Sequence, residues 1–409
     1  MRLLHTADWH LGARLQGRSR LPEQEALLRE ICGIAERESV DVVVIAGDVF
    51  DAYSPPVEAE RLYFETTARL ADGGRRAVVV IAGNHDSPDH LVAAKALSRS
   101  HGVVTLGRPK DDPGSFDLGT GRVACVDSAP SFARIRVPSG HEISLLLLPY
   151  PSESRLHELL SVTIDDEQGA HEGYNRRLAE IMQGLADRHA GQGPLMIVSH
   201  LFVDGGREGG YERPIQVGGA YGVHPFTFPS SVPYVALGHL HAPQEFHHPD
   251  GPIIRYSGSI LQNGFGETGQ TKSVTLVDFI DNAVTRREVP LVSGRPLVRI
   301  ASSDLADLET RIASLEGDHW IGIDFTLTEG IAPEDLDDLR RRTPSIVDVA
   351  FAHARALDDA SATADAVIGL AIDDQFRRYV ETTFNEPCDE QILHLFLDLL
   401  ESARSGPDA

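Results

Sequence analysis

Five short apolar runs, rich in valine and isoleucine, each end in side chains that can bind a metal ion or transfer a proton. In chain order the endings are HTADWH (5–10), AGD (46–48), AGNHD (82–86), SH (199–200) and GHLH (238–241). β-Branched runs of this length are typical of buried strands. Because strand ends at one edge of a sheet converge in space, we expect the fold to bring these polar groups together.

The segments between the five runs predict an α/β fold. PEQEALLREICGIAERES (22–39) and RLYFETTARLADGG (61–74) have apolar residues at helical spacing, and their alternation with strands favours strands buried on both faces. After about residue 120 the predicted strands follow one another closely, in RVACVDS, ARIRV and ISLLLLPY, so the second half of the core should be more antiparallel. We therefore predict sheets packed face to face with helices outside, rather than one parallel sheet.

The domain organisation is predicted from breaks in this pattern. A first domain should cover 1–290, because VPLVSGRP (289–296) has the composition of a linker. Residues 291–355 read as strand, helix, strand, helix, strand, which suffices for a small α/β capping domain. ALDDASATADA (356–366) is predicted to be a flexible linker. Residues 367–409 are predicted to form C-terminal helices whose apolar faces need a partner.

Charge and cysteine usage restrict the class of protein. The net charge is −24, and residues 291–409 contribute −14 of it, with 10 Lys and Arg against 24 Asp and Glu. Nucleic-acid binders usually present a basic surface, so a nucleic-acid substrate would need metal ions, local arginines or a partner to supply positive charge. Three cysteines without CxxC spacing argue against a disulfide framework or a thiolate zinc site. Without a signal sequence or an apolar run that could span a bilayer, we expect a cytoplasmic protein with no membrane association.

The polar endings indicate a binuclear metal site. Side chains two residues apart face the same way where a strand ends, which suits both Asp8-x-His10 and His239-x-His241. The candidate ligands are two aspartates, one asparagine and four histidines: Asp8, His10, Asp48, Asn84, His200, His239 and His241. This set is too large for one ion and suits two divalent ions of the Mn, Fe or Zn type, of which Mn(II) is expected. Asp48 follows a central strand and is the natural bridge. Two such ions are suited to phosphoester hydrolysis.

The series D-x-H, GD, GNHD, H and GHxH resembles that of the calcineurin-like metallophosphoesterases, over residues 1 to about 280. The sequence around the motifs, in HTADWHLG, AGDVFD followed by SPP, AGNHDSP, SHLFVDGG, ERPIQVGG and YVALGHLHAPQ, is similar to the DNA nuclease subunits that work with an SMC-like ATPase, as in bacterial SbcCD complexes. The resemblance implies an α/β fold with a four-layer metallophosphoesterase β-sandwich flanked by helices, a small α/β cap domain and C-terminal helices.

The same resemblance implies roles for the individual residues. One ion would be held by Asp8, His10, Asp48 and His241, and the other by Asp48, Asn84, His200 and His239. His85 would be the catalytic residue that stabilises the transition state or protonates the leaving oxygen. Asp86 would either orient His85 or cap a turn.

Three further positions are less well defined by the resemblance. At Asp51 the archaeal and eukaryotic relatives carry histidine, so no catalytic role transfers to it. The glycine-rich stretch GGREGGYERPIQVGG (205–219) should form a loop beside the site. Its Arg207 and Arg213 are candidates for contact with a phosphate backbone.

The implied activity is hydrolysis of DNA phosphodiesters, as a double-strand exonuclease and a single-strand or hairpin endonuclease in DNA repair and recombination. The implied partner is an SMC-like ATPase, with a homodimer of this subunit inside a heterotetramer associated with the nucleoid. Two alternatives are a small-molecule nucleotide phosphodiesterase of the same fold and a non-catalytic scaffold on that fold. The match outside the metal motifs disfavours the first, and the complete set of ligand positions disfavours the second.

Overall fold

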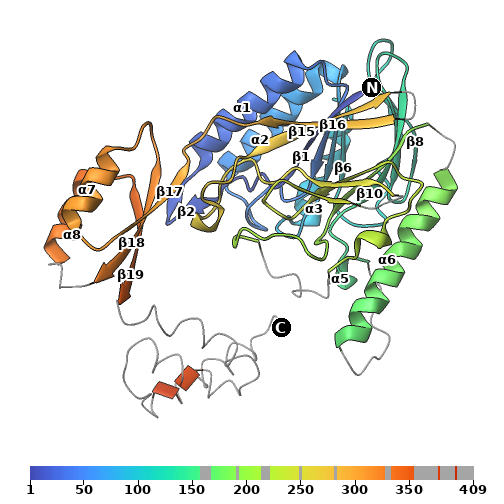
Figure 1. The fold of residues 1–409 in the computed structure, drawn as a ribbon. Coiled ribbons are helices and arrows are strands. Elements are labelled where there is room, and N and C mark those ends of the chain that lie inside the picture. The colour runs from blue at the N-terminus through green and yellow to red at the C-terminus, as the bar shows by residue number, and fades with distance from the viewer. Residues whose placement is uncertain are drawn as a thin grey trace.

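The fold is built on two large sheets that pack face to face (Figure 1). The computed structural model describes residues 1–156, 167–189, 193–212, 222–247, 251–280, 283–327, 333–353, 376–377 and 392–393. The first sheet has six strands in the order β16-β15-β1-β4-β5-β6, and the second has eight in the order β13-β14-β12-β11-β10-β9-β8-β7. The α/β class and the face-to-face sheets predicted from the sequence are confirmed.

The first sheet combines a parallel half with an antiparallel edge. Its parallel strands are β1 (Arg2–Thr6), β4 (Val42–Ala46), β5 (Ala77–Ile81) and β6 (Val103–Leu106). Its antiparallel strands are β15 (Ser273–Ile280), which pairs with β1, and β16 (Ala283–Pro290). β4 lies between β1 and β5, so the carboxyl ends of these three strands emerge side by side.

The second sheet is mixed, and the strands from which a more antiparallel half was predicted, β8 to β10, are antiparallel as expected. Antiparallel pairs join β7 (Phe116–Asp117), β8 (Ala124–Ala129), β9 (Phe132–Arg136) and β10 (Glu142–Leu148). The centre is parallel, in β10, β11 (Leu195–His200), β12 (Tyr234–Gly238) and β14 (Ile253–Tyr256), with β13 (Gln244–His247) antiparallel at the edge. The sequence analysis predicted no partners for β12 and β14, which are parallel neighbours with β13 between them in the chain.

Alternating side chains of the central strands build separate cores on the two faces of each sheet. On β4, Val42 and Val44 pack between the sheets, whereas Val43 and Ile45 pack under the outer helices α1 (Leu21–Arg37) and α2 (Val57–Ala71). The second sheet is covered on its outer face by α6 (Glu167–His189). The order of layers is therefore helix, sheet, sheet, helix, with the strands of the centre buried on both faces.

A separate small sheet stands beside the first two (Figure 1). It contains three parallel strands, β17 (Leu297–Ser302), β18 (Trp320–Leu327) and β19 (Ile346–His353), with the helices α7 (Leu305–Ala313) and α8 (Pro333–Arg342) between them. A capping domain with the bounds 291–355 stays a prediction. The predicted linker 356–366 lies outside the described residues, as do the predicted C-terminal helices over 367–409 apart from two short pieces.

The remaining elements are short. They are β2 (Arg14–Leu15), β3 (Arg18–Ser19), α3 (Pro88–Val92), α4 (Lys95–Arg99), α5 (Glu153–Leu156) and the 3-10 turns η1 (Asp72–Gly74), η2 (Pro225–Thr227) and η3 (Phe265–Glu267). None of the helices in the described ranges is long and apolar enough to cross a membrane.

Candidate metal centre

The predicted ligands lie where strands of both sheets end, and four of them have unusual backbone conformations. Asp8, His10, Asp48 and His239 all have positive φ, at 52°, 45°, 49° and 107°. Such conformations cost on the order of 1–3 kcal/mol for a residue other than glycine, and they persist only where the surroundings enforce them. Backbone hydrogen bonds do so here, because Asp8 N donates to Gly47 O and His10 N donates to Asp48 O, both at 3.0 Å. The strain directs these side chains into one cluster.

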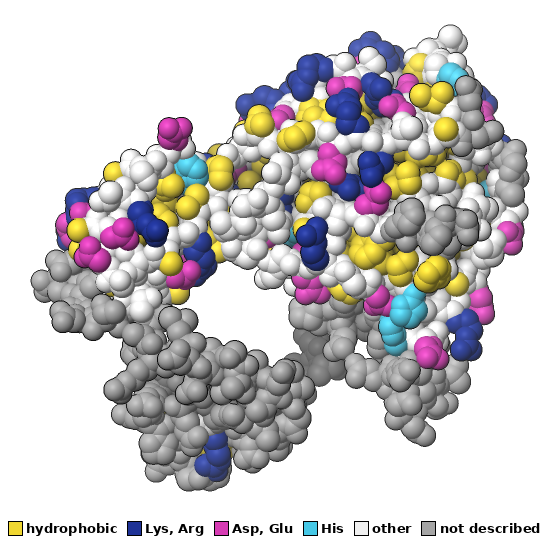
Figure 2. Space-filling model, in the orientation of Figure 1, with side chains coloured by type: hydrophobic (Ala, Val, Ile, Leu, Met, Phe, Trp, Pro, Cys, Tyr) yellow, Lys and Arg dark blue, Asp and Glu magenta, His cyan; other side chains and the backbone are white. Residues whose placement is uncertain are grey.

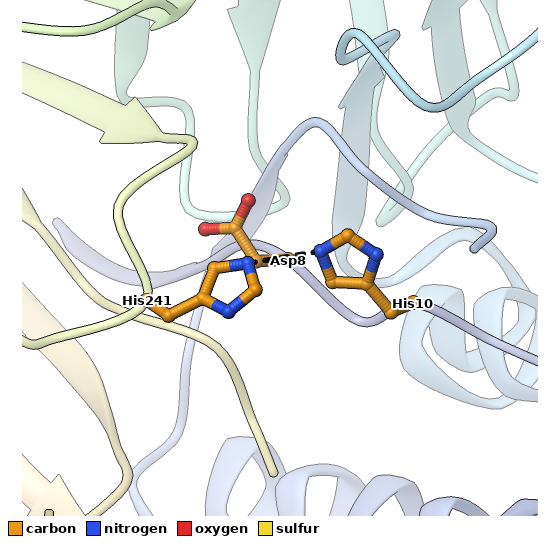
Figure 3. A group of neighbouring side chains, drawn as sticks. All are labelled: Asp8, His10 and His241. Carbon is orange, nitrogen blue, oxygen red and sulfur yellow. Dashed lines mark hydrogen bonds between the residues drawn. The ribbon is translucent and has the colours of Figure 1, made fainter. Parts of the chain in front are cut away.

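The first group of ligands is formed by Asp8, His10 and His241 (Figure 3). The Nε2 atoms of the two imidazoles face each other at 3.0 Å. Asp8 Oδ2 is buried and has no hydrogen-bond partner within the described residues. His241 Nδ1 donates to Glu267 Oε1 at 2.7 Å, so that Nε2 is the nitrogen that faces the cluster. Lone pairs that converge beside an unsatisfied carboxylate oxygen fit a divalent cation.

The second group is formed around the amide oxygen of Asn84. Asn84 Oδ1 lies 2.8 Å from His200 Nε2 and 3.1 Å from His239 Nδ1. His200 Nδ1 donates to Ala46 O at 2.9 Å, which again leaves Nε2 facing the cluster. This arrangement, in which a backbone carbonyl fixes the tautomer of an imidazole, is the usual second shell of a metal-binding histidine.

Asp48 connects the two groups. Its Oδ2 lies 3.7 Å from His10 Nε2 and 3.4 Å from His200 Nε2. Its Oδ1 accepts a hydrogen bond from His85 N at 2.8 Å. One carboxylate oxygen therefore faces imidazoles of both groups, which is the position that a bridging ligand requires. All seven predicted ligands are brought together in this one buried cluster.

The two buried aspartates differ in their affinity for protons. Burial raises the pKa of Asp8 to about 7, opposed only in part by nearby imidazoles, His200 above all. Burial also acts upward on Asp48, but His200 and the other imidazoles outweigh it and hold the pKa of this carboxyl well below its usual range. Burial lowers the pKa of His10 to about 4 and that of His239 to about 3. These two imidazoles are therefore neutral at pH 7, whereas Asp48, against the effect of burial, raises the pKa of His200 to about 9, so a metal ion would have to displace a proton there.

Two carboxylates outside the predicted set orient the ligands of the first group. Glu267 is fully buried, accepts from His241, and pairs with Lys272 Nζ at 2.7 Å. Asp51 Oδ1 lies 3.4 Å from His10 Nδ1 and accepts from the Tyr211 hydroxyl at 2.9 Å. The sequence analysis gave Asp51 no catalytic role and did not identify Glu267 or Tyr211. Glu267 is 26 residues from His241 in the chain, and no motif links the two.

His85 lies at the same cluster, where its donor atom and those of His10 and Asp51 are within 4.8 Å of one another. Its Nε2 is 4.0 Å from Asp48 Oδ2, and its Nδ1 hydrogen bonds with the carbonyl oxygen of Asp51 at 2.9 Å. Of the two roles considered for Asp86, capping a turn matches the contacts. Its carboxylate accepts from the backbone amides of Val49, Phe50 and Gly83, and thereby joins the loops that follow β4 and β5.

The glycine-rich loop is described only in part. Glu212 accepts hydrogen bonds from Gly209 N, Tyr211 N and His241 N, so this loop is attached to a predicted ligand. Arg207 N donates to Gln244 Oε1 at 2.9 Å. Arg213, the other candidate for contact with phosphate, lies outside the described residues.

Comparison with known proteins gives consistent similarities over most of the chain. Residues 1–243 match the family model described as calcineurin-like phosphoesterase. The chain is 37% identical over 404 residues to the SbcD nuclease subunit of Bacillus subtilis, covering 98% of this chain and 97% of that protein. The SbcD nuclease subunit of Rhodobacter capsulatus is 36% identical over 318 residues, covering 77% of this chain and 75% of its own. The Escherichia coli K12 protein is 26% identical over 424 residues, covering 100% of both.

Proposed function

This chain belongs to the calcineurin-like phosphoesterases and is a nuclease subunit of the SbcCD kind, and from this premise we propose that it hydrolyses DNA phosphodiesters at the cluster around Asp48. The observation that carries the proposal is the position of Asp48 Oδ2, which faces imidazoles of both ligand groups. A site with one bridging carboxylate and two ligand groups suits two-metal phosphoester chemistry.

The proposed assignment of ligands follows the two groups. Asp8, His10, Asp48 and His241 would hold one ion, and Asp48, Asn84, His200 and His239 the other. Two divalent ions would supply Lewis-acid stabilisation of the phosphate and activation of water. We propose Mn(II), because four imidazoles combined with carboxylate and amide oxygens suit it better than Mg²⁺.

The proposed role of His85 is to transfer a proton to the leaving oxygen. Its Nδ1 is occupied by the hydrogen bond with Asp51 O, so Nε2 is the atom available to substrate. This Nε2 faces the same Asp48 oxygen that connects the ligand groups. A general acid placed beside the reacting phosphate would contribute about 10²–10⁴-fold to the rate.

A His85→Ala variant tests this function. We expect cleavage of plasmid and single-stranded DNA to fall by at least about 100-fold, while two metal ions per chain remain bound by elemental analysis. Wild-type activity should require Mn²⁺, be abolished by EDTA and be low with Mg²⁺ alone. His90→Ala, which removes a half-exposed histidine from α3, is the matched control. Loss of a metal ion in His85→Ala would make His85 a ligand, and full activity of that variant would contradict the proposed role.

The acidic charge of the chain is compatible with a DNA substrate if metal ions and a partner supply the positive field. On the face drawn in Figure 2, Lys and Arg are interspersed with Asp and Glu rather than gathered in one basic patch. A small-molecule nucleotide phosphodiesterase is the competing function. Relatives named as nucleases that match up to the full length of this chain favour the DNA nuclease.

We further propose that residues 367–409 bind an SMC-like ATPase, with two copies of this subunit in a heterotetramer. Support comes from the SbcCD assembly in the names of the relatives and from the apolar residues in FRRYV and ILHLFLDLL. A chain that ends at Ala364 tests this directly. It should retain Mn²⁺-dependent cleavage of single strands but fail to co-purify with the ATPase. Undiminished binding of the ATPase by the truncated chain would contradict the proposal.

A further inference from the structure

A second group of metal-binding side chains lies outside the centre around Asp48. His171 on α6, Asp204 after β11 and His224 before η2 each direct one donor atom into a space where these atoms lie within 4.8 Å of one another. None of the three belongs to the predicted centre. Imidazole with carboxylate is a donor set that transition metals bind.

The distances lie near the edges of a coordination sphere, and two of them are shorter. Asp204 Oδ2 lies 2.6 Å from His224 Nδ1 and 3.5 Å from His171 Nε2. The carbonyl oxygen of Gly222 lies 2.7 Å from His171 Nε2 and is a fourth possible donor. Metal–nitrogen bonds of about 2.0–2.1 Å separate neighbouring donors of a tetrahedral site by about 3.3 Å, so only small shifts are needed.

Asp204 provides an independent indication. Its Oδ2 atom is buried and accepts no hydrogen bond of acceptable geometry within the described residues, although His224 Nδ1 is close to it. A buried carboxylate oxygen without a directed hydrogen bond is able to bind a cation. Gly222 permits this approach, because a Cβ there would overlap Asp204 Oδ1.

The surroundings hold the group in place. Asn175, one turn after His171 on α6, donates to Gly222 O at 2.8 Å and accepts from His224 N at 2.8 Å. Asp204 N donates to Val223 O at 3.0 Å. The donors therefore rest on a helix and on a backbone bridge, which is the support that a metal site requires.

The location of the group suggests what a bound ion would do. Asp204 precedes and His224 follows the glycine-rich loop whose Tyr211 contacts Asp51 and whose Glu212 contacts His241 N. An ion bound by both ends would close the base of this loop and anchor it to α6. We propose that His171, Asp204 and His224 form a third, structural site for a divalent ion of the zinc type, separate from the two catalytic ions.

The test counts Zn²⁺ bound to the full-length chain by elemental analysis after gel filtration in a Zn²⁺ buffer. We expect the His171→Gln/His224→Gln double variant to bind one Zn²⁺ fewer than the wild type, and the single His224→Gln variant to bind that ion at least about tenfold more weakly. His101→Gln, which removes another exposed histidine, should bind as much as the wild type. Because the readout is a difference between variants, it is independent of whether the centre around Asp48 binds both of its ions.

A second measurement follows the loop itself. Hydrogen exchange of the amides in 205–212 should slow on addition of Zn²⁺ in the wild type and in His101→Gln, but not in the double variant. Equal Zn²⁺ content in the wild type and the double variant would overturn the proposal and leave the three residues as an ion-pair cluster. The proposal would also be overturned if the hydrogen exchange of 205–212 responded to Zn²⁺ equally in the wild type and in the double variant.

Discussion

At the scale of single residues, two carboxylates outside the predicted ligand set lie beside the Nδ1 atoms of His10 and His241. Glu267 accepts from His241 Nδ1, and Asp51 lies beside His10 Nδ1. In both imidazoles Nε2 faces the cluster. Removal of such outer partners typically weakens metal binding by about 10–100-fold.

Glu267→Gln should weaken both metal binding and the metal-free fold. Burial alone would raise the pKa of Glu267, but His241 and Lys272 outweigh it and lower the pKa to about 2. The ionised carboxylate thus stabilises the fold at neutral pH, and this contribution is lost as the pH falls from about 4.5 through about 2. We expect the variant to lose about 3 kcal/mol in urea unfolding with EDTA at pH 7, because Lys272 would stay buried without its partner.

The pH dependence and a surface control make this test specific. The difference in unfolding free energy between Glu267→Gln and the wild type should shrink as the pH is lowered below 4.5. Glu25→Gln removes an exposed helical pair with Arg29 and should change stability by less than about 0.5 kcal/mol. Equal stability of the Glu267 variant and the Glu25 variant at pH 7 would contradict the assignment.

Asp51→Asn should weaken one metal site selectively. Titration with Mn²⁺ followed by electron paramagnetic resonance should show one ion bound about 10–100-fold more weakly and the other nearly unchanged. Tyr211→Phe removes only the hydroxyl that donates to Asp51 and should have a smaller effect in the same direction. Tyr53→Phe, at an exposed ring, is the control. Equally weakened binding of both ions would mean that Asp51 acts on the whole fold rather than on one metal site.

At the scale of elements, the site depends on loops that join neighbouring strand ends. The Asp86 carboxylate holds the turns after β4 and β5 together through three backbone amides. Arg155 on α5 adds hydrogen bonds to Gly83 O and Asp86 O. These contacts position Asp48, which follows β4, and Asn84, which follows β5.

Asp86→Ala should therefore destabilise the fold and reduce metal binding together. Three buried amides would lose their acceptor, at a cost of about 3 kcal/mol or more in urea unfolding of the metal-free protein. Asp86→Asn retains one side-chain oxygen, so its unfolding free energy should lie between that of the alanine variant and that of the wild type. Asp89→Ala removes an exposed partner of Arg108 and should cost less than about 1 kcal/mol. The prediction is wrong if the Asp86→Ala and Asp89→Ala variants unfold alike.

At the scale of the whole molecule, the small sheet is attached to the two large ones through Trp320. Its indole Nε1 donates to Glu23 Oε1 at 2.9 Å, and the Arg295 guanidinium lies 3.7 Å from the ring centroid. Glu23 also pairs with the buried Arg20. Leu15 and Val347 pack with Trp320 in the same contact.

Trp320→Phe should loosen this attachment and leave the metal centre intact. The lost hydrogen bond to a carboxylate is worth about 2 kcal/mol, so protease cleavage in 290–297 should become faster while metal content stays constant. Phe351→Leu alters an exposed aromatic ring on β19 and should leave the cleavage rate unchanged. If both variants are cleaved at the wild-type rate, the attachment does not depend on the indole.

The sequence by itself determined the strands that end in polar residues, because β-branched runs followed by Asp, His or Asn are local patterns. It therefore predicted the α/β layers and the seven candidate ligands before any geometry was known. Local patterns do not record which strands are neighbours. For this reason the parallel pairing of β12 with β14 was missed.

Only the tertiary structure decided the contacts between residues distant in the chain. Glu267 and His241, Asp51 and Tyr211, and Trp320 and Glu23 meet through folding and carry no shared motif. The same holds for His171, Asp204 and His224, which come from a helix and two loops. The physical reason is that the ends of parallel strands meet at predictable edges of a sheet, whereas these contacts join loops, helices and strands whose relative positions depend on packing.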